Sequence, residues 1–281
     1  MSWSDVRLQR GVNPASPAPV RGVALLVSLL CLCLGLAQPV RAESCAVAAG
    51  LEYCLYPGPE PTLVLLSGLG NAMDSWPPSF LRALNRLAGV LTYNRRGYGR
   101  SNAVMSATVT ARETATDLEA LLAELDLQQV VLVGHSLGGL YAQFLARHQP
   151  SRVVAVVLLD ASSPFEPLDN TRFRTRAQLR SDSIDDLESR GIDESLDLIR
   201  RSPSSPPIPW IVISATEHGE SAELEAEWQR IQAATATQSP RGRHVVARGS
   251  GHDLARDQPA LVIEEIRTLL QQLRTVPSPG S

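Results

Sequence analysis

The stretch Val-Val-Leu-Val-Gly-His-Ser-Leu-Gly-Gly, residues 130 to 139, decides the fold class of this chain. Its first four residues are apolar and rich in β-branched side chains, which predicts a buried strand. The next five read Gly-x-Ser-x-Gly, and the apolar residues from Leu137 onward have the spacing of an amphipathic helix. A serine on a sharp strand-to-helix turn has strained backbone angles that expose its hydroxyl beside helix N-terminal N–H groups. We therefore interpret Ser136 as a nucleophile, with an ordinary glycine-rich turn as the alternative.

Composition and charge fit one globular domain with a sizeable core. The chain has 281 residues, a hydrophobic fraction of 44% and a formal net charge of −3. This balance does not call for a nucleic-acid partner or an anionic membrane. All 26 basic residues are arginine, because the sequence contains no lysine. Schiff-base catalysis, a Ser–Lys dyad, a pyridoxal phosphate anchor and a P-loop each need a lysine, so these chemistries are excluded.

The first 42 residues have the pattern of an export signal. Residues 23–37 form an uncharged apolar run, and small residues at Val40 and Ala42 suit cleavage after Ala42. Positive charge precedes the run at Arg7, Arg10 and Arg21. A membrane-spanning helix is the alternative, but about 15 apolar residues are short for a bilayer. We expect a mature domain over residues 43–281, exported to a periplasm or secreted, with no stable membrane anchor after cleavage.

Cysteine usage agrees with export. Cys31 and Cys33 fall within the expected leader, which leaves Cys45 and Cys54 in the mature chain. In an oxidising compartment this pair could form one disulfide across a β-hairpin, and two unpaired small apolar residues are the alternative. The sequence contains no Cys and His cluster with the spacing of metal ligands. We therefore expect no metal site.

Strand and helix patterns alternate along the mature chain. The predicted strands cover residues 51–56, 62–66, 90–93, 130–133, 153–159, 210–214 and 244–247. The predicted helices cover residues 79–87, 113–125, 137 onward, 175–187, 194–200, 222–233 and 259–273. This order predicts an α/β fold with a doubly wound, mostly parallel sheet. Residues 161–208 interrupt the alternation and predict a short helical cap insert above the carboxyl ends of the strands, where such sheets bind ligands.

The order of motifs resembles the α/β-hydrolase fold superfamily across nearly the whole mature chain. The likeness rests on Leu65–Gly70, the turn Asn94–Ser101, the elbow at Ser136 and Gly249–His252. Residues 212–214 and 243–252 look especially like the corresponding segments of bacterial exported or lipid-active hydrolases of this type. The chain departs from the superfamily pattern at Ser67, where histidine is usual, and at Asn94, where aspartate is usual. The first change leaves a backbone N–H donor intact, and the second keeps a side chain that can brace a turn but removes its charge.

The resemblance implies a triad in the chain order serine, acid, histidine. His252 follows a strand and a glycine and becomes the expected base. The other histidines, which lack this context, are His135, His148, His218 and His244. The acid is Asp160, after the strand 153–159, or Glu217, after the strand 210–214. A carboxylate at the mouth of an apolar strand needs a partner, which favours Asp160 over Glu217. Asp253 and Asp257 are weaker candidates.

The resemblance also implies an oxyanion hole built from the backbone N–H groups of Leu69 and Leu137. The expected reaction is acyl transfer to water through an acyl-enzyme, with a small-molecule carboxylic ester as substrate and no cofactor. A serine nucleophile argues against the dehalogenase and epoxide hydrolase branches, which use aspartate. An aminopeptidase, an acyltransferase or a catalytically silent binding protein on this scaffold are the alternatives. An aminopeptidase would use carboxylates of the insert to hold a substrate amine, although the pattern favours a solvated helix face for them. These carboxylates are Asp182, Asp185, Asp186 and Glu188.

Overall fold

The computed structural model describes residues 45–104, 106–166 and 182–275. They belong to a compact unit that covers residues 40–281. The expected leader, residues 1–42, lies outside the described residues. Within the described ranges, no helix is long and apolar enough to cross a membrane.

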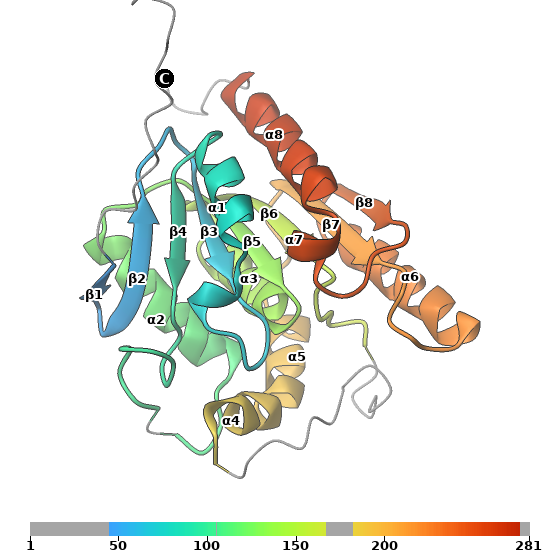
Figure 1. The fold of residues 1–281 in the computed structure, drawn as a ribbon. Coiled ribbons are helices and arrows are strands. Elements are labelled where there is room, and N and C mark those ends of the chain that lie inside the picture. Colours follow the sequence, from blue (N-terminus) through green and yellow to red (C-terminus); the bar gives the residue numbers. More distant parts are fainter. Residues whose placement is uncertain (1–44, 105, 167–181, 276–281) are drawn as a thin grey trace, which may run out of the picture. The chain divides into compact units, whose positions relative to one another are not determined.

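An eight-stranded sheet forms the centre of the described unit, in the order β1-β2-β4-β3-β5-β6-β7-β8 (Figure 1). The strands are β1 (Ala46–Ala48), β2 (Leu51–Tyr56), β3 (Thr62–Leu66), β4 (Val90–Tyr93), β5 (Val130–His135), β6 (Val153–Leu159), β7 (Pro209–Ala215) and β8 (Arg241–Ala247). β1 and β2 pair antiparallel at one edge, whereas β4, β3 and β5 to β8 run parallel. Cys45 and Cys54 are joined by a disulfide across the β1–β2 hairpin.

Helices cover both faces of the sheet. Successive residues of a central strand point to opposite faces, and both sets are apolar, so each face needs a covering layer. The helices are α1 (Pro78–Asn85), α2 (Ala111–Glu124), α3 (Leu137–His148), α4 (Ile184–Arg190), α5 (Ile192–Arg200), α6 (Ala222–Ala236), α7 (Leu254–Asp257) and α8 (Pro259–Thr275), with a short 3₁₀ turn η1 (Met73–Ser75). In β3, Val64 and Leu66 belong to the core under α2, α3 and α5, whereas Leu63 and Leu65 belong to the core under α1, α7 and α8. Each fully buried side chain of this size contributes about 1.5–3 kcal/mol. The predicted doubly wound, mostly parallel sheet is confirmed.

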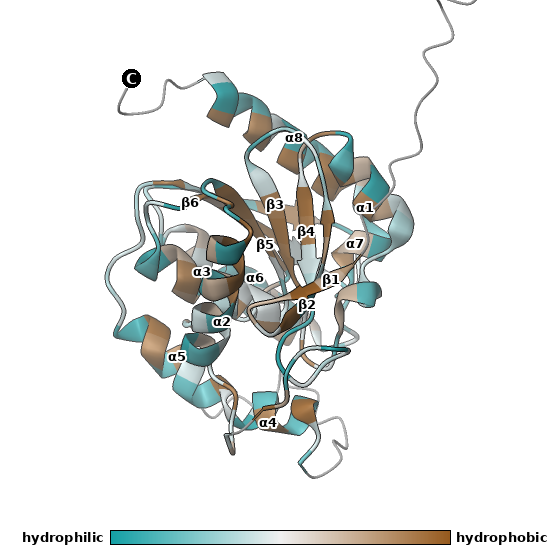
Figure 2. Ribbon diagram, turned by 90° about the vertical axis from the view of Figure 1, so that its left-hand side faces the viewer, coloured by the Kyte–Doolittle hydropathy of each residue, from teal (hydrophilic) through white to brown (hydrophobic). Residues whose placement is uncertain are grey.

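Local sequence explains where these helices begin and which face they bury. α2 starts after Thr110, whose side chain and backbone form a capping box with Glu113. α8 buries Val262, Ile266 and Leu269, at helical spacing. Figure 2 shows this difference in hydropathy, with mostly hydrophobic strands and with hydrophobic and hydrophilic residues alternating along α8.

The cap insert contains α4 and α5, which lie near the carboxyl ends of the strands (Figure 1). The helix expected over residues 175–187 overlaps α4, Ile184–Arg190, and residues 175–181 of the expected range lie outside the described residues. β1 and α7 were not predicted, because elements of three or four residues are too short to display a periodicity.

Candidate active site

Ser136 occupies a strained turn between β5 and α3. Its backbone angles are φ 53° and ψ −124°, a left-handed conformation that non-glycine residues rarely adopt. The Ser136 backbone N–H donates to the Leu159 carbonyl at 3.1 Å, which ties the turn to the end of β6. A Cβ at Gly138 would lie 2.2 Å from the Leu66 carbonyl oxygen, and one at Gly134 would lie 2.5 Å from the Gly139 Cα. The glycines of the motif are therefore required by close backbone packing around the serine.

The structure brings Asp160 and His252 together. Asp160 directly follows β6 and is completely buried, whereas His252 lies in the loop between β8 and α7. Nδ1 of His252 is 2.6 Å from Oδ2 of Asp160. A carboxylate accepts hydrogen bonds only, so Nδ1 carries the proton and Nε2 keeps its lone pair. This is the tautomer that a general base for Ser136 needs.

Asp160 remains ionised although it is buried. Oδ1 accepts hydrogen bonds from the Ala215 backbone N–H at 2.9 Å and from the Trp228 indole N–H at 2.7 Å. Burial disfavours the charged form, but hydrogen bonds from His218 and His252 outweigh it and hold the pKa of Asp160 well below its usual value.

Glu217 is the alternative candidate for the acid. It follows β7 and is exposed, and its backbone N–H donates to the Ser250 carbonyl at 3.0 Å. Among the hydrogen bonds of the described residues, none joins Glu217 to His252. The geometry therefore agrees with the preference for Asp160.

His218 is part of this site, although the sequence offered no motif for it. Its Nε2 is 2.7 Å from Oδ2 of Asp160, and its Nδ1 is 2.8 Å from Oε2 of Glu225 in α6. Burial lowers its pKa, but the bonds to Asp160 and Glu225 prevail and raise the pKa of His218 to about 9. We call Asp160, His218, Glu225 and His252 the acid–base cluster.

Nitrogen and oxygen atoms of Asp160, His218 and His252 lie within 4.8 Å of one another. Two histidines and a carboxylate are a donor set that transition metals accept. Here both rings instead bond directly to the same carboxylate oxygen, at 2.6 and 2.7 Å. We therefore interpret the group as a hydrogen-bonded network that holds protons.

The expected oxyanion loop is held from behind by Arg95. Its Nη1 donates to the Ser67 carbonyl at 2.7 Å and its Nη2 to the Gly68 carbonyl at 2.9 Å. The C=O and N–H of a trans peptide point in opposite directions, so the Leu69 N–H points away from Arg95. Leu137 is the first residue of α3, and its N–H therefore has no partner within the helix. Both expected donors belong to residues that line one cavity with Ser136.

Arg95 in turn forms a buried ion pair with the cap insert. Its Nε is 2.5 Å from Oε1 of Glu188 in α4, and the Tyr98 hydroxyl donates to Oε2 of Glu188 at 2.7 Å. Burial opposes the charge of Arg95, but Glu188 overcomes this effect and raises the pKa of Arg95. Glu188 is completely buried, which corrects its interpretation as part of a solvated helix face. Of the other insert carboxylates, Asp182 is exposed, and Asp185 and Asp186 are half-buried. We call Arg95, Tyr98 and Glu188 the arginine brace.

His135 braces the loop that carries His252. Its Nε2 is 3.0 Å from the His252 backbone carbonyl oxygen, and the two ring centroids are 4.7 Å apart. Burial lowers the pKa of His135 to about 4, so the ring is neutral at pH 7 and donates from Nε2. The described residues contain no hydrogen bond between Ser136 Oγ and His252, a contact that is often long without substrate and shortens in the reacting complex.

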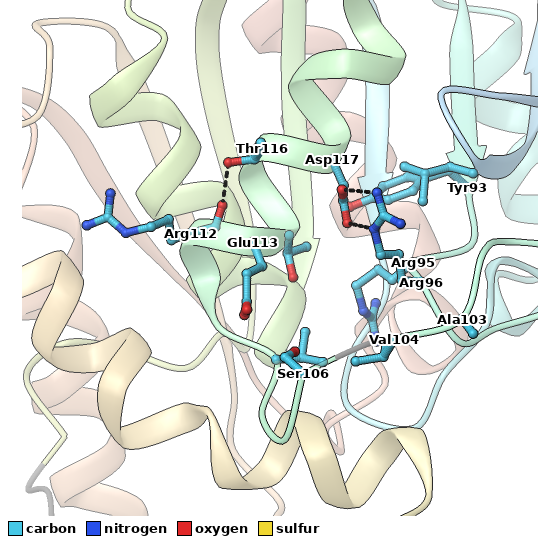
Figure 3. Close-up of a pocket in the computed structure, with 13 residues that line it drawn as sticks. Tyr93, Arg95, Arg96, Ala103, Val104, Ser106, Arg112, Glu113, Thr116 and Asp117 are labelled. Atoms are coloured by element: carbon cyan, nitrogen blue, oxygen red, sulfur yellow. Dashed lines mark hydrogen bonds and ion pairs between the residues drawn. The ribbon is translucent and has the colours of Figure 1, made fainter.

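The cavity above Ser136 has a volume of about 280 Å³. Asp160 and His252 line it from the sheet side, and Ser189 and Ile192 line it from the cap insert. A larger cavity of about 480 Å³ lies beside α2 and contains none of the expected triad residues. Figure 3 shows its Arg96–Asp117 ion pair, with a closest distance of 2.6 Å. The residues expected to carry the chemistry therefore line the smaller cavity.

Part of the chain is similar in sequence to known proteins. The family described as alpha/beta hydrolase fold matches residues 61–180. A protein of Pseudomonas syringae pv. syringae named "Putative carbamate hydrolase RutD" is 41% identical over 119 residues, which cover 42% of this chain and 46% of that protein. A protein of the same name from Agrobacterium fabrum is 32% identical over 133 residues, 47% of this chain and 48% of that protein. The chain spans about half the length of the curated relatives it matches.

Solved structures resemble a larger share of the chain. A thermophilic esterase from Thermogutta terrifontis has a TM-score of 0.59 at 21% identity and covers 80% of this chain and 95% of its own. A hydrolase from Pseudomonas aeruginosa PA01 has a TM-score of 0.62 at 21% identity, with coverages of 82% and 99%. At these identities the likeness concerns the fold.

Proposed function

We propose that this chain, which belongs to the α/β-hydrolase fold superfamily, is a serine hydrolase that transfers an acyl group to water. One observation carries the proposal. His252 Nδ1 is 2.6 Å from the buried Asp160 carboxylate, and both residues line the cavity that contains the strained Ser136. This combination supports a nucleophile, a base of defined tautomer and an acid that stabilises the protonated base.

The proposed reaction has two halves. Ser136 Oγ attacks the ester carbonyl carbon while its proton passes to Nε2 of His252, and the resulting imidazolium is stabilised by Asp160. The C–O bond to the alcohol then breaks, and His252 gives its proton to the leaving alkoxide. In the second half, water loses a proton to His252 and attacks the acyl carbon. The bond to Ser136 Oγ breaks, the carboxylic acid leaves and the serine regains its proton.

The oxyanion that forms in each half would be bound by the Leu69 and Leu137 N–H groups. Arg95 supports this role because it bonds the Ser67 and Gly68 carbonyls and so orients the following peptide. Each donor aimed at a developing oxyanion typically contributes roughly a hundredfold or more in rate.

We propose carboxylic esters of small acyl groups as the substrate class. The cavity of about 280 Å³ lies below the range of roughly 300–1,000 Å³ typical for drug-sized ligands. Carbamates are a second candidate, because the curated relatives carry the name of carbamate hydrolases. A carbamate contains the same acyl carbonyl, so Ser136 could attack it in the same way.

We also propose export with removal of residues 1–42. The apolar run of the leader and the Cys45–Cys54 disulfide support it, since disulfides persist in oxidising compartments. Mass spectrometry of the protein in the periplasmic fraction is expected to find Glu43 as the first residue. An uncut chain in the cytosolic fraction would contradict export.

A fluorophosphonate probe tests the nucleophile directly. We expect one adduct, on the peptide that contains Ser136, and none in the Ser136→Ala variant. Ser162→Ala is the matched control, because Ser162 lines the same cavity and its backbone N–H, not its hydroxyl, donates to the Ser136 carbonyl at 3.1 Å. Hydrolysis of p-nitrophenyl esters of increasing acyl length, with a carbamate and an aminoacyl anilide of similar size, then identifies the substrate class. No adduct together with no hydrolysis would overturn the proposal.

A further inference from the structure

We infer that His218 is a positioning residue that holds a positive charge behind Asp160 at neutral pH, and that Glu225 balances this charge. Because the two charges balance, the proposed base His252 faces the net charge of a single aspartate, and loss of either member of the pair upsets that balance. The inference deepens the proposed function and rests on it for its kinetic consequences.

The geometry of the His218 ring requires both of its nitrogens to carry a proton. Nε2 is 2.7 Å from Oδ2 of Asp160, and Nδ1 is 2.8 Å from Oε2 of Glu225. Ionised carboxylates only accept hydrogen bonds, so each nitrogen must donate. An imidazole with two N–H groups is a cation. The direction of its pKa shift, to about 9, agrees with this assignment.

Glu225 is held in place to provide the balancing charge. Its Oε1 accepts from the His218 backbone N–H at 2.7 Å, so both of its oxygens bond one residue. Glu225 lies in the first turn of α6, where the helix dipole favours an anion. The side chains of His218 and Glu225 are only 18% and 19% exposed, which limits screening by solvent.

The groups packed around His218 define the local charge. The carboxylates of Asp160 and Glu225 face it directly, the His252 ring centroid is 6.2 Å away, and the Trp228 ring meets it edge-on at 5.7 Å. The two carboxylates, Asp160 and Glu225, and the one cation, His218, together place a net charge of −1 next to His252. A single unpaired aspartate would supply the same net charge.

Removing one member of the pair therefore shifts this balance in a definite direction. Without the His218 cation, two negative charges remain and the imidazolium form of His252 is favoured. Without Glu225, the cation cancels Asp160 and the imidazolium form is disfavoured. Opposite charges within about 4–6 Å change such protonation equilibria by about one pH unit or more. A merely structural role would not produce effects of opposite sign.

The first test compares pH profiles of kcat/KM, whose acid limb reports protonation of the base in the free enzyme. We expect His218→Gln to move the midpoint of this limb up by about one pH unit. Glu225→Gln acts from farther away and is expected to move it down by about half a unit. The double variant is expected to return close to the wild-type midpoint. Shifts in the same direction, or unchanged midpoints, would overturn the inference.

Glu223→Gln is the matched control for Glu225→Gln. Glu223 lies in the same first turn of α6 but is exposed. Its loss removes the same formal charge from the helix terminus, so an unchanged acid limb is expected. A shift equal to that of Glu225→Gln would attribute the effect to the helix terminus and contradict the role of the pair.

The second test reads the charge of His218 without turnover. Nitrogen-15 NMR of the full wild-type chain is expected to show both His218 ring nitrogens protonated at pH 7 and deprotonation near pH 9, the value given by its environment. A neutral ring at pH 7 would overturn the inference, even if His218→Gln failed to fold. The spectrum does not depend on the reactivity of Ser136. A failed fluorophosphonate reaction would therefore contradict the proposed function, while the NMR spectrum would still decide whether His218 is charged.

Discussion

Two buried carboxylates have opposite surroundings: Asp160 directly follows β6, and Glu188 lies in α4 of the cap insert. Both side chains are completely inaccessible to solvent. Asp160 contacts two histidines, one of which, His252, is 48% exposed at the side chain. Glu188 contacts Arg95 and Tyr98, which are also buried.

The difference separates proton chemistry from positioning. Histidine side chains change charge near neutral pH, so a cluster that contains them is suited to proton transfer. Two members of the acid–base cluster, Asp160 and His252, also line the cavity. A guanidinium keeps its charge at all accessible pH values, so the arginine brace can only hold its partners in place. It holds the oxyanion loop on one side and α4 of the cap insert on the other. The following predictions test this division.

The largest effect is expected at the acid–base cluster. Asp160→Asn keeps the shape of the side chain but offers only one accepting oxygen, so the tautomer of His252 is no longer enforced. We expect kcat/KM for a short ester to fall about 10⁴-fold, as such substitutions do in serine hydrolases.

Glu217→Gln is the control for Asp160→Asn, because Glu217 follows the neighbouring strand and is exposed. It is expected to retain activity within about threefold, since it removes no bond to His252. If Glu217→Gln alone abolished turnover, the acid would be Glu217 and the division between the two carboxylates would fail.

At the arginine brace the main loss is expected in stability. Glu188→Gln leaves the buried guanidinium of Arg95 without its counter-charge, which typically costs about 3–5 kcal/mol. Urea unfolding measures this change. Glu194→Gln, on the exposed first turn of α5, is the matched control and is expected to change stability by less than about 0.5 kcal/mol. Equal values for the two variants would show that Glu188 is not part of a brace.

Arg95→Lys tests whether the brace also acts on the oxyanion loop. A lysine keeps the charge but lacks the planar fork that reaches Glu188 and two carbonyls at once. We expect kcat to fall roughly ten- to a hundredfold with little change in KM, because the loop donors matter most in the transition state. A change confined to KM would assign the effect to substrate binding.

The smallest expected effect is a loss of stability between about pH 6.5 and 9, to which His218 of the acid–base cluster contributes. The folded pKa of His218, about 9, is above its ordinary value of 6.5. The stabilisation is therefore complete below pH 6.5 and is lost as pH rises through about 9. We expect the free energy of unfolding to fall by on the order of 1 kcal/mol over this window. The same measurement on His218→Gln should give a flatter curve, and an identical slope would contradict the assignment.

The sequence was sufficient for much of the fold and for part of the site. Long strands and helices were predicted to within a few residues, because their apolar residues recur with a fixed period. The strained geometry of Ser136 was predictable because ten consecutive residues encode it. The short elements β1 and α7 were missed for lack of a period.

The contacts that complete the site were not readable from local patterns. His218 has no motif, yet it bonds Asp160, 58 positions earlier. Arg95 and Glu188 are 93 positions apart, and Glu188 belongs to a segment whose carboxylates suggested a solvated face.

One long-range contact explains a departure from the superfamily pattern, the asparagine at position 94 where aspartate is usual. The carboxylate at this turn comes from β2 instead, because the Asn94 amide donates to Glu52 Oε2 at 2.8 Å.

By itself, the sequence determined the alternation of strands and helices, the serine elbow and the histidine before the last long helix. These features depend on backbone geometry and on periodicity within about ten to twenty residues, which neighbours in sequence specify. Only the tertiary structure decided which carboxylate meets His252, which histidine stands behind it and what holds the oxyanion loop. Those contacts depend on the order of the strands in the sheet and on burial, because a charged group in the interior is stable only beside the partner that folding brings to it.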